Sequence, residues 1–235
     1  MNLKEVMAAL KAKGSEQIRR ILMRHGAPDS LLGVRIGDMK PIAKRIKGDQ
    51  TLAMELYGTG IGDAQYLAGM VADGRKMTVR ELQGWADHAA WDMISGYTVA
   101  WVASEHPAGF KLGVKWTKSK QEHVMRAGWT TLGAIAATVP DEQLPLAKYG
   151  RLLERVVREI GRAPDGAKYT MNGFVISVGT YVAPLGTKAM EVAKKIGKVE
   201  IDMGGTSCTV PVAAEHIVKC RRGAAVAPKR QTVRC

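Results

Sequence analysis

The stretch AAWDMISGYTVAW, residues 89–101, holds the residues whose types and spacing could do chemistry. In a helix Ser95 lies one turn after Trp91, so the two side chains share a face, whereas Asp92 is rotated by about 100° and joins them only from the side. An aromatic face can attract a cationic group, and a carboxylate can neutralise it. The stretch is therefore either a core helix that contains a carboxylate or one wall of a site for an aromatic or cationic ligand.

Two later stretches offer further candidates. Arg126 lies between apolar positions of a predicted helix in QEHVMRAGW, where it either pairs with a carboxylate such as Asp92 or holds a phosphate. The stretch YTMNGFVISVGTY, residues 169–181, carries no charge, and Asn172, Gly173 and Phe174 lie at its middle. A backbone or a partner could approach closely there.

Other kinds of site find little support. The glycines of GTGIGDAQ, residues 58–65, follow no predicted strand, and no Gly-Lys-Ser/Thr occurs, so this stretch is predicted to be a turn between helices. The five histidines show no pair at i, i+4, so no metal is expected, and no cofactor. Three cysteines near the C-terminus form no disulfide framework, which favours a reduced, cytoplasmic protein.

The charge indicates a polyanionic partner. The formal net charge is +13, and residues 219–235 alone hold six Lys or Arg and no acid. Further basic residues lie near the N-terminus, among them Lys40, Lys44 and Arg45. A protein that neutralises phosphates releases their counterions, so this charge favours binding to nucleic acid. A solvated basic surface that only aids solubility is the alternative.

Helical periodicity dominates the chain, which predicts an all-α fold of about eleven helices joined by short turns that contain Gly or Pro. Helices of similar length with short connections favour antiparallel pairs stacked into an α-α superhelix of the HEAT or armadillo type; an irregular bundle is the alternative. We expect one domain over residues 1–220 and a basic, flexible tail over residues 221–235. Residues 197–210 are an isolated strand or a loop, in which Gly204–Ser207 lead into a helix or form a nest for a phosphate.

Five stretches, in order and spacing, resemble the AlkD-type DNA alkylation repair proteins over roughly residues 5–220. Each motif is loose, and the run of five in register makes the likeness. The stretches are LLGVRIGDMKPIAKRI (31–46), AQYLAGMVAD (64–73), AAWDMISG (89–96), HVMRAGWTTLG (123–133) and YTMNGFVISVGTYV (169–182).

The resemblance implies a HEAT-like solenoid that holds duplex DNA in a basic groove. Glycosylase members of the family remove cationic N3- and N7-alkylated purines with a Trp, an Asp one helical turn later, an Arg on a following helix and a second Trp. The carboxylate and the aromatic faces stabilise the positive charge that develops on the sugar, and the Arg holds a phosphate.

This chain departs from the family pattern at two of those four positions. Trp91 matches the first Trp and Arg126 the phosphate-holding Arg, while Ser95 occupies the place of the catalytic Asp and Phe174 that of the second Trp. A serine supplies no counter-charge, and the loss of one such group typically costs roughly 10²–10³ in rate. Asp92, directly after Trp91, can supply the missing carboxylate only in part, because its side chain is rotated away from the face that Trp91 and Ser95 share.

The sequence therefore predicts a divergent, monomeric member that binds duplex DNA, alkylated or structurally altered, with weak or absent base excision; in a bacterium it would be associated with the nucleoid. Two alternatives stay open. The first is an active glycosylase in which Asp92 or another carboxylate does the work. The second is a non-enzymatic scaffold that binds proteins.

Overall fold

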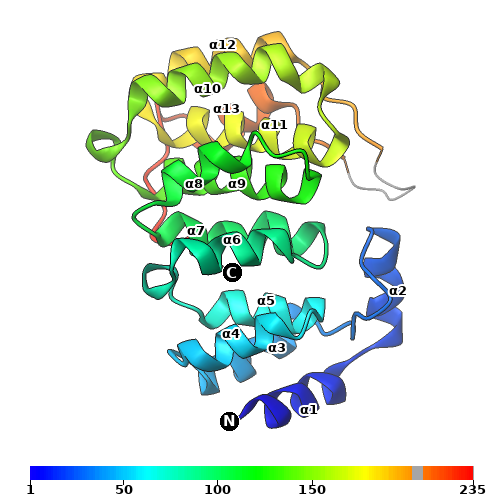
Figure 1. Ribbon diagram of the computed structural model, residues 1–235. Helices are drawn as coiled ribbons and strands as arrows, with labels where there is room; N and C mark the ends of the chain where they lie inside the picture. Colours follow the sequence, from blue (N-terminus) through cyan, green and yellow to red (C-terminus); the bar gives the residue numbers. More distant parts are fainter. Residues whose placement is uncertain (203–208, 235) are drawn as a thin grey trace. The chain divides into compact units, whose positions relative to one another are not determined.

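The computed structural model describes residues 1–202 and 209–234, which fall into two compact units (Figure 1). The first unit comprises residues 1–108 with Arg234, and the second comprises residues 109–202 and 209–233. Thirteen α-helices and no strand occur in these described ranges, so the prediction of an all-α fold is confirmed. The division after Ala108 was not expected, because helical periodicity continues through it and the composition does not change there.

The first unit is built from short helices, and the starts of several of them are fixed by a side-chain cap. Thr78 and Glu81 form a capping box: the Glu81 N–H donates to Thr78 Oγ1 over 3.1 Å, and the Thr78 N–H donates to the Glu81 carboxylate over 2.7 Å. The helices are α1 (Leu3–Lys13), α2 (Glu16–Arg24), α3 (Ile36–Arg45), α4 (Gln50–Gly58), α5 (Gly62–Val71), α6 (Val79–Asp87) and α7 (Ala100–Glu105), with a 3₁₀ turn η1 (Gly74–Lys76) and a π-helical segment η2 (Ile94–Val99).

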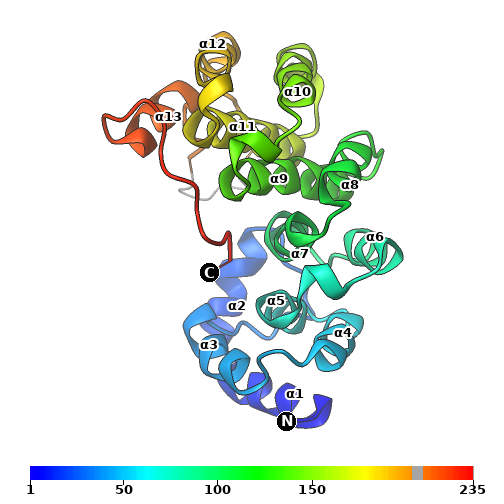
Figure 2. The ribbon, with the colours of Figure 1, turned by 90° about the vertical axis from the view of Figure 1, so that its left-hand side faces the viewer.

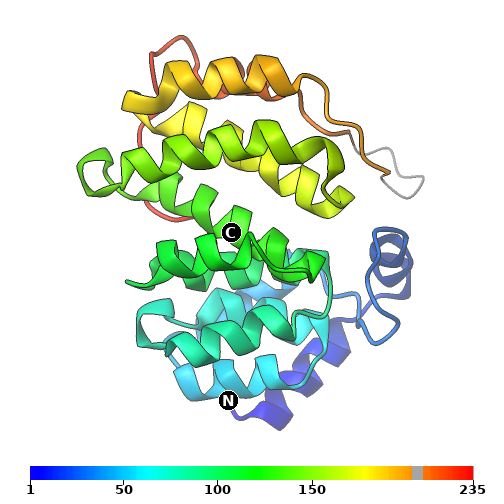
Figure 3. The same ribbon diagram turned by 45° about the horizontal axis from the view of Figure 1, so that its top comes forward.

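The second unit is arranged in two layers. One layer holds α9, α11 and α13, and the other holds α8, α10 and α12 (Figure 2). Helix α9 packs against both α8 and α11, and α10 lies beside α12 (Figure 3). The helices are α8 (Gly109–Trp116), α9 (Glu122–Thr138), α10 (Leu146–Glu159), α11 (Asp165–Tyr181), α12 (Gly186–Ile196) and α13 (Ala213–Arg221), with 3₁₀ turns η3 (Asp141–Gln143), η4 (Ile160–Arg162) and η5 (Ala183–Leu185).

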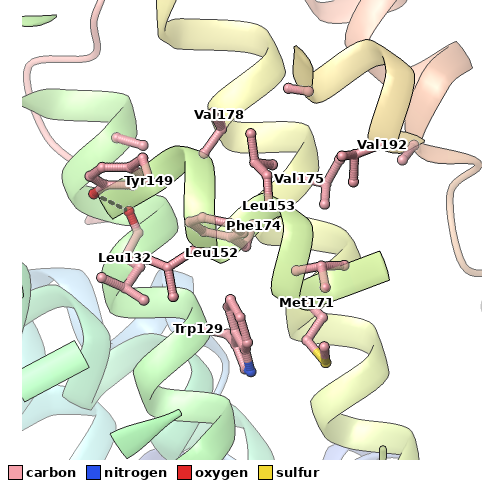
Figure 4. Close-up of a cluster of buried hydrophobic side chains, with 14 of the residues drawn as sticks. Trp129, Leu132, Tyr149, Leu152, Leu153, Met171, Phe174, Val175, Val178 and Val192 are labelled. Carbon is pink, nitrogen blue, oxygen red and sulfur yellow. Dashed lines mark hydrogen bonds between the residues drawn. The ribbon is translucent and has the colours of Figure 1, made fainter. Parts of the chain in front are cut away.

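An aromatic cluster forms the core of the second unit (Figure 4). Phe174 lies between Trp129 and Tyr149, with ring centroids 5.2 and 5.9 Å away, and all three side chains are buried. The Tyr149 hydroxyl donates to the Leu132 carbonyl oxygen over 2.9 Å, which satisfies its polar end. This core fixes α9, α10 and α11 relative to one another.

The structure adds two local details. Although proline is favoured in the first turn of a helix, Pro41 lies inside α3, because that helix already begins at Ile36. Residues 199–202 and 209–210 form no strand, while the Gly204–Ser207 segment lies outside the described residues. Pro211 precedes α13 by two residues and accepts a hydrogen bond from Asn172 Nδ2 over 2.9 Å, so a backbone does approach the middle of α11.

The residues that were expected to form a flexible tail instead make ordered contacts. The Ala227 N–H donates to the Thr180 carbonyl, and the Arg230 N–H to the Ala137 carbonyl, both over 2.8 Å. Thr180 and Ala137 lie in the last turns of α11 and α9, whose carbonyls have no partner within their own helices. The C-terminal residues therefore cap these two helices.

Basic side chains of the same segment are also engaged. Lys229 Nζ lies 2.7 Å from an Asp141 carboxylate oxygen, and the Arg234 guanidinium is paired with the Glu105 carboxylate within the first unit. Their positive charges are thus partly neutralised by the protein itself, a fact that the sequence pattern of six basic residues and no local acid did not indicate.

Candidate functional site

Trp91 lies at the start of a helix rather than inside one. Its carbonyl oxygen accepts the first hydrogen bonds of the helical turn, from the N–H groups of Ile94 over 2.9 Å and Ser95 over 3.1 Å. The indole is half-buried, and no hydrogen-bond partner of its Nε1 is found in the described part of the chain. A Cβ placed on Gly62 would lie 3.1 Å from that nitrogen, so the glycine at the start of α5 makes room for the ring.

The segment just before Trp91 is held by a buried glutamine. The Gln65 side chain accepts from the Ala90 N–H and donates to the His88 carbonyl oxygen, both over 2.9 Å. Gln65 is only 1% exposed, so these bonds are shielded from water. The amide of Gln65 thereby fixes the entry of the chain into the Trp91 helix.

Asp63 performs the same task for the loop before α3. Its two carboxylate oxygens accept from the N–H groups of Leu32 over 2.6 Å and Val34 over 2.8 Å, on either side of Gly33. Gly33 has φ +75°, a conformation that favours glycine. The sequence signal that could have identified Asp63 and Gln65 is that both are polar residues within an otherwise apolar stretch, the first turns of α5.

A small apolar pocket of about 120 Å³ opens beside Trp91 within the first unit. This volume is about four times the share of one water molecule in the liquid. The walls offer hydrophobic contact far more than hydrogen bonding, so the pocket suits an apolar or aromatic group. It is lined by Ile18, Leu22, Leu31, Val34, Arg35, Ile36, Met39, Gly62, Asp63, Tyr66, Trp91, Met93 and Ile94.

Ser95 is buried and its hydroxyl is engaged. Ser95 Oγ donates to the Asp92 carbonyl oxygen over 3.1 Å, and the residue is 0% exposed. It lies in the π-helical segment η2, a kind of irregularity that is frequent at functional sites. The Asp92 side chain, by contrast, is exposed. The chain therefore places a buried hydroxyl, and not a carboxylate, one turn after Trp91.

In the second unit Arg126 lies against the start of α11. A Cβ placed on Gly166 would overlap the Arg126 guanidinium, so the absence of a side chain at Gly166 leaves room for it. Next to it, the Gly166 N–H donates to a Glu122 carboxylate oxygen over 2.7 Å. Arg126 is half-buried, so its guanidinium is positioned by packing between α9 and α11.

The structure departs from the prediction at Phe174. Instead of offering an aromatic face to a ligand, Phe174 is 1% exposed and belongs to the aromatic core of the second unit (Figure 4). The apolar character of residues 169–181 reflects this burial. Lys40, Lys44 and Arg45 are exposed on α3 of the first unit.

The structure thus brings Trp91, Asp92 and Ser95 together in the first unit, and it places Arg126 and Phe174 in the second. Within the first unit, the half-buried Trp91 indole, its apolar pocket and the exposed Asp92 carboxylate are the elements that could meet a ligand.

A family model described as DNA alkylation repair enzyme matches residues 6–195. The chain belongs to this family. Two similar proteins are uncharacterized proteins from Listeria innocua, at 31% identity, and Listeria monocytogenes, at 30%; each match covers 90% of this chain and 94% of the relative.

A solved structure is similar over the full length of both chains, with 37% sequence identity and a TM-score of 0.91. It is described as a new family of proteins related to the HEAT-like repeat DNA glycosylases with affinity for branched DNA structures. The HEAT-like helical architecture expected from the sequence is therefore confirmed, as is membership of the DNA alkylation repair family.

No helix in the described residues is both long and apolar enough to cross a membrane.

Proposed function

We propose that this protein binds DNA, with a preference for branched structures, and excises alkylated bases weakly or not at all. Support for branched DNA comes from the solved structure that is 37% identical over the whole of both chains and whose description includes affinity for branched DNA. Membership of the DNA alkylation repair family supports DNA as the partner.

One observation argues most directly against excision. The position one turn after Trp91, where the resemblance places a catalytic carboxylate, holds Ser95, whose buried hydroxyl is bonded to the Asp92 backbone. An alkylated purine is already a cationic leaving group, so the chemistry depends on a charge that stabilises the sugar. A neutral, buried hydroxyl offers no such charge. Phe174, at the second departing position, is occupied in core packing.

The cations that could hold phosphates are present in both units. Lys40, Lys44 and Arg45 are exposed on α3, and Arg126 is positioned at the start of α11. Contacts of Lys or Arg with phosphates supply affinity that does not depend on the base sequence. Affinity for branched DNA would then come from the arrangement of phosphates rather than from reading of bases.

The test is binding of a labelled four-way junction and of a duplex of the same arm sequence, followed by fluorescence anisotropy at about 50 and 200 mM salt. We expect tighter binding of the junction and a steep loss of affinity between the two salt concentrations. Equal affinity for both DNAs would contradict the preference for branches. A flat salt dependence would contradict DNA binding and favour a scaffold for proteins.

A second candidate is base excision by Asp92. The observation in its favour is that the Asp92 carboxylate is exposed and directly follows Trp91. This mechanism requires that Asp92→Asn abolish the release of 7-methylguanine from duplex DNA. If the wild-type protein releases none, the second candidate fails.

A further inference from the structure

A groove of about 510 Å³ lies between α8 and α10 in the second unit. Of its nine lining residues six are Lys or Arg and none is acidic. Helices α8 and α10 belong to the layer opposite to α9 and α11, which position Arg126 (Figure 2). The groove is therefore separate from the candidate site. It is lined by Phe110, Lys111, Val114, Lys118, Lys148, Arg151, Leu152, Arg155 and Arg158.

The cations follow one face of α10. Lys148, Arg151, Arg155 and Arg158 are spaced by three, four and three residues, which puts them in a single row, and Lys111 and Lys118 face them from α8 and the turn after it. Like charges at this spacing repel one another. Glu154 on the same helix offsets part of this repulsion, because the pKa of its carboxyl is lowered by Lys188 and also by the charges of Arg158 and Arg151.

Of the six cations that line the groove, Arg155 is the one held by hydrogen bonds and an ion pair within the described residues. Arg155 donates to Thr117 Oγ1 over 2.7 Å and to the Thr117 carbonyl over 2.8 Å, pairs with Glu159 over 2.8 Å, and lies 5.3 Å from the Trp129 ring centroid. The other five cations are exposed, and no ion pair with them is found within residues 1–202 and 209–234. Five exposed positive charges thus surround the groove, of which Arg151 and Arg158 also attract the Glu154 carboxylate.

The floor of the groove is apolar and partly aromatic. Phe110, Val114 and Leu152 form it, and the Phe110 ring packs against the Tyr149 ring, with centroids 5.3 Å apart. Lys148 Nζ lies over the Phe110 ring, 5.9 Å from its centroid. A ligand that fits both parts has several anionic groups and a flat apolar ring.

We propose that this groove binds an unpaired strand of DNA, with phosphates on the cations and a base against Phe110. A duplex keeps its bases inside and offers only phosphates to such a surface, whereas an unpaired strand offers both, which is the usual pairing of basic groove and aromatic platform in single-strand binding. The inference rests on the proposed function and deepens it: the unpaired strand would be an arm or flap of the branched DNA, held on the second helical layer.

The test compares two DNAs by fluorescence anisotropy: a blunt duplex and the same duplex with a single-stranded flap. The groove variant is Lys148→Glu with Arg151→Glu. Its matched control is Lys194→Glu with Lys195→Glu, which makes the same change in net charge at exposed positions of α12. We expect the groove variant to bind the flap about tenfold more weakly than the control does, with duplex affinity equal in the two variants.

A third variant separates stacking from charge. Phe110→Leu keeps an apolar side chain over Tyr149 and leaves the charge unchanged, so we expect it to lose part of the preference for the flap while the salt dependence stays as in the wild type. Circular dichroism and thermal unfolding establish that each variant is folded. In the groove variant, by contrast, the salt slope for the single strand should become shallower by roughly 0.7 for each phosphate that the protein no longer binds.

Three results would overturn the groove as a single-strand site. One is that the groove variant and the control variant lose affinity to the same extent, for the flap DNA and for the duplex alike. Another is displacement of the labelled flap DNA by free thymidine monophosphate at the same concentration at which an unlabelled single strand displaces it. This result would indicate a small-molecule site. The third is tighter binding of polyglutamate than of the strand, which would indicate an acidic protein.

A failure of the proposed function looks different. If the wild-type protein binds neither the junction nor the blunt duplex, the proposed function is wrong. Binding of the isolated single strand, abolished in the groove variant and kept in the control, would still support the groove in that case, and its absence would overturn it.

Discussion

The Ser95 hydroxyl donates a hydrogen bond to the Asp92 backbone carbonyl, three residues earlier, over 3.1 Å. The side chain at position 95 is thereby turned back onto its own helix and is fully buried. An Asp at this position would have to place its carboxylate in the same buried space, next to a carbonyl oxygen that repels it.

We therefore expect Ser95→Asp to destabilise the protein by about 3 kcal/mol or more, rather than to restore excision, because an unpaired charge would be buried. Ser95→Ala removes one neutral hydrogen bond and should cost about 1 kcal/mol. Urea unfolding measures both values. If Ser95→Asp were as stable as the wild type and released 7-methylguanine, position 95 would face a ligand after all.

Gln65 should control how Trp91 is presented. Gln65→Leu leaves the Ala90 N–H and the His88 carbonyl without their present partner, so we expect a loss of about 1–3 kcal/mol in the free energy of unfolding. The tryptophan emission should shift as well, and the shift should vanish in a Trp91→Phe background. A shift that persists there would come from another tryptophan, and Gln65 would then not position Trp91.

The packing of Arg126 against Gly166 allows a separate test of whether Arg126 binds a phosphate. Alanine in a helix is normally more stable than glycine by about 0.5–1 kcal/mol, but a Cβ at position 166 would overlap the Arg126 guanidinium. We expect Gly166→Ala and Arg126→Ala each to weaken binding to all DNA sequences, and the double variant to bind no more weakly than Arg126→Ala alone.

Gly173→Ala is the matched control on the same helix, because a Cβ there meets nothing within 4 Å. It should leave DNA affinity unchanged. If Gly166→Ala and Gly173→Ala behaved alike in the binding assay, the position of Arg126 against α11 would not matter for DNA.

Removal of residues 222–235 should destabilise the second unit. The truncation uncovers carbonyls in the last turns of α9 and α11 and removes Lys229, which pairs with Asp141, so we expect the free energy of unfolding to fall by roughly 1–3 kcal/mol. Thermal unfolding of the full and truncated chains measures it. An unchanged melting temperature would indicate that these residues do not cap the helices in solution.

Asp165 should contribute to the acid sensitivity of the protein. The side-chain hydrogen bond from Lys168, followed by the backbone N–H of Asp202, lowers the pKa of the Asp165 carboxyl below its ordinary value of 3.8. A lowered pKa in the folded state means stability that is present above pH 3.8 and is lost as the pH falls through the folded-state pKa. The difference in melting temperature between the wild type and Asp165→Asn should therefore shrink below about pH 4. A difference that stays constant would show that Asp165 is not held by these partners.

The helices and their order could be predicted because apolar periodicity, caps and glycine turns are local, as the capping box of Thr78 and Glu81 illustrates. The role of Phe174 could not, because a buried aromatic and an aromatic wall have the same sequence pattern; only the contacts with Trp129 and Tyr149 distinguish them. The packing of the C-terminal residues was hidden for a similar reason. Their partners, the carbonyls of Ala137 and Thr180, are backbone groups, and sequence carries no mark of them.

The groove between α8 and α10 could be predicted from the sequence only in part. The row of Lys148, Arg151, Arg155 and Arg158 is visible in the sequence, but its convergence with Lys111 and Lys118 depends on how two helices are placed. A basic helical face became a candidate site only when the opposite wall and the Phe110 floor were known.

The most direct test of the central claim is a single-turnover experiment on a DNA junction that carries one 7-methylguanine in an arm, with protein in excess and binding followed in the same samples. The account predicts that the junction is bound while release of 7-methylguanine stays at the rate without protein. Release above that rate by the bound wild-type protein would contradict it, since a carboxylate other than one at position 95 would then be performing the excision.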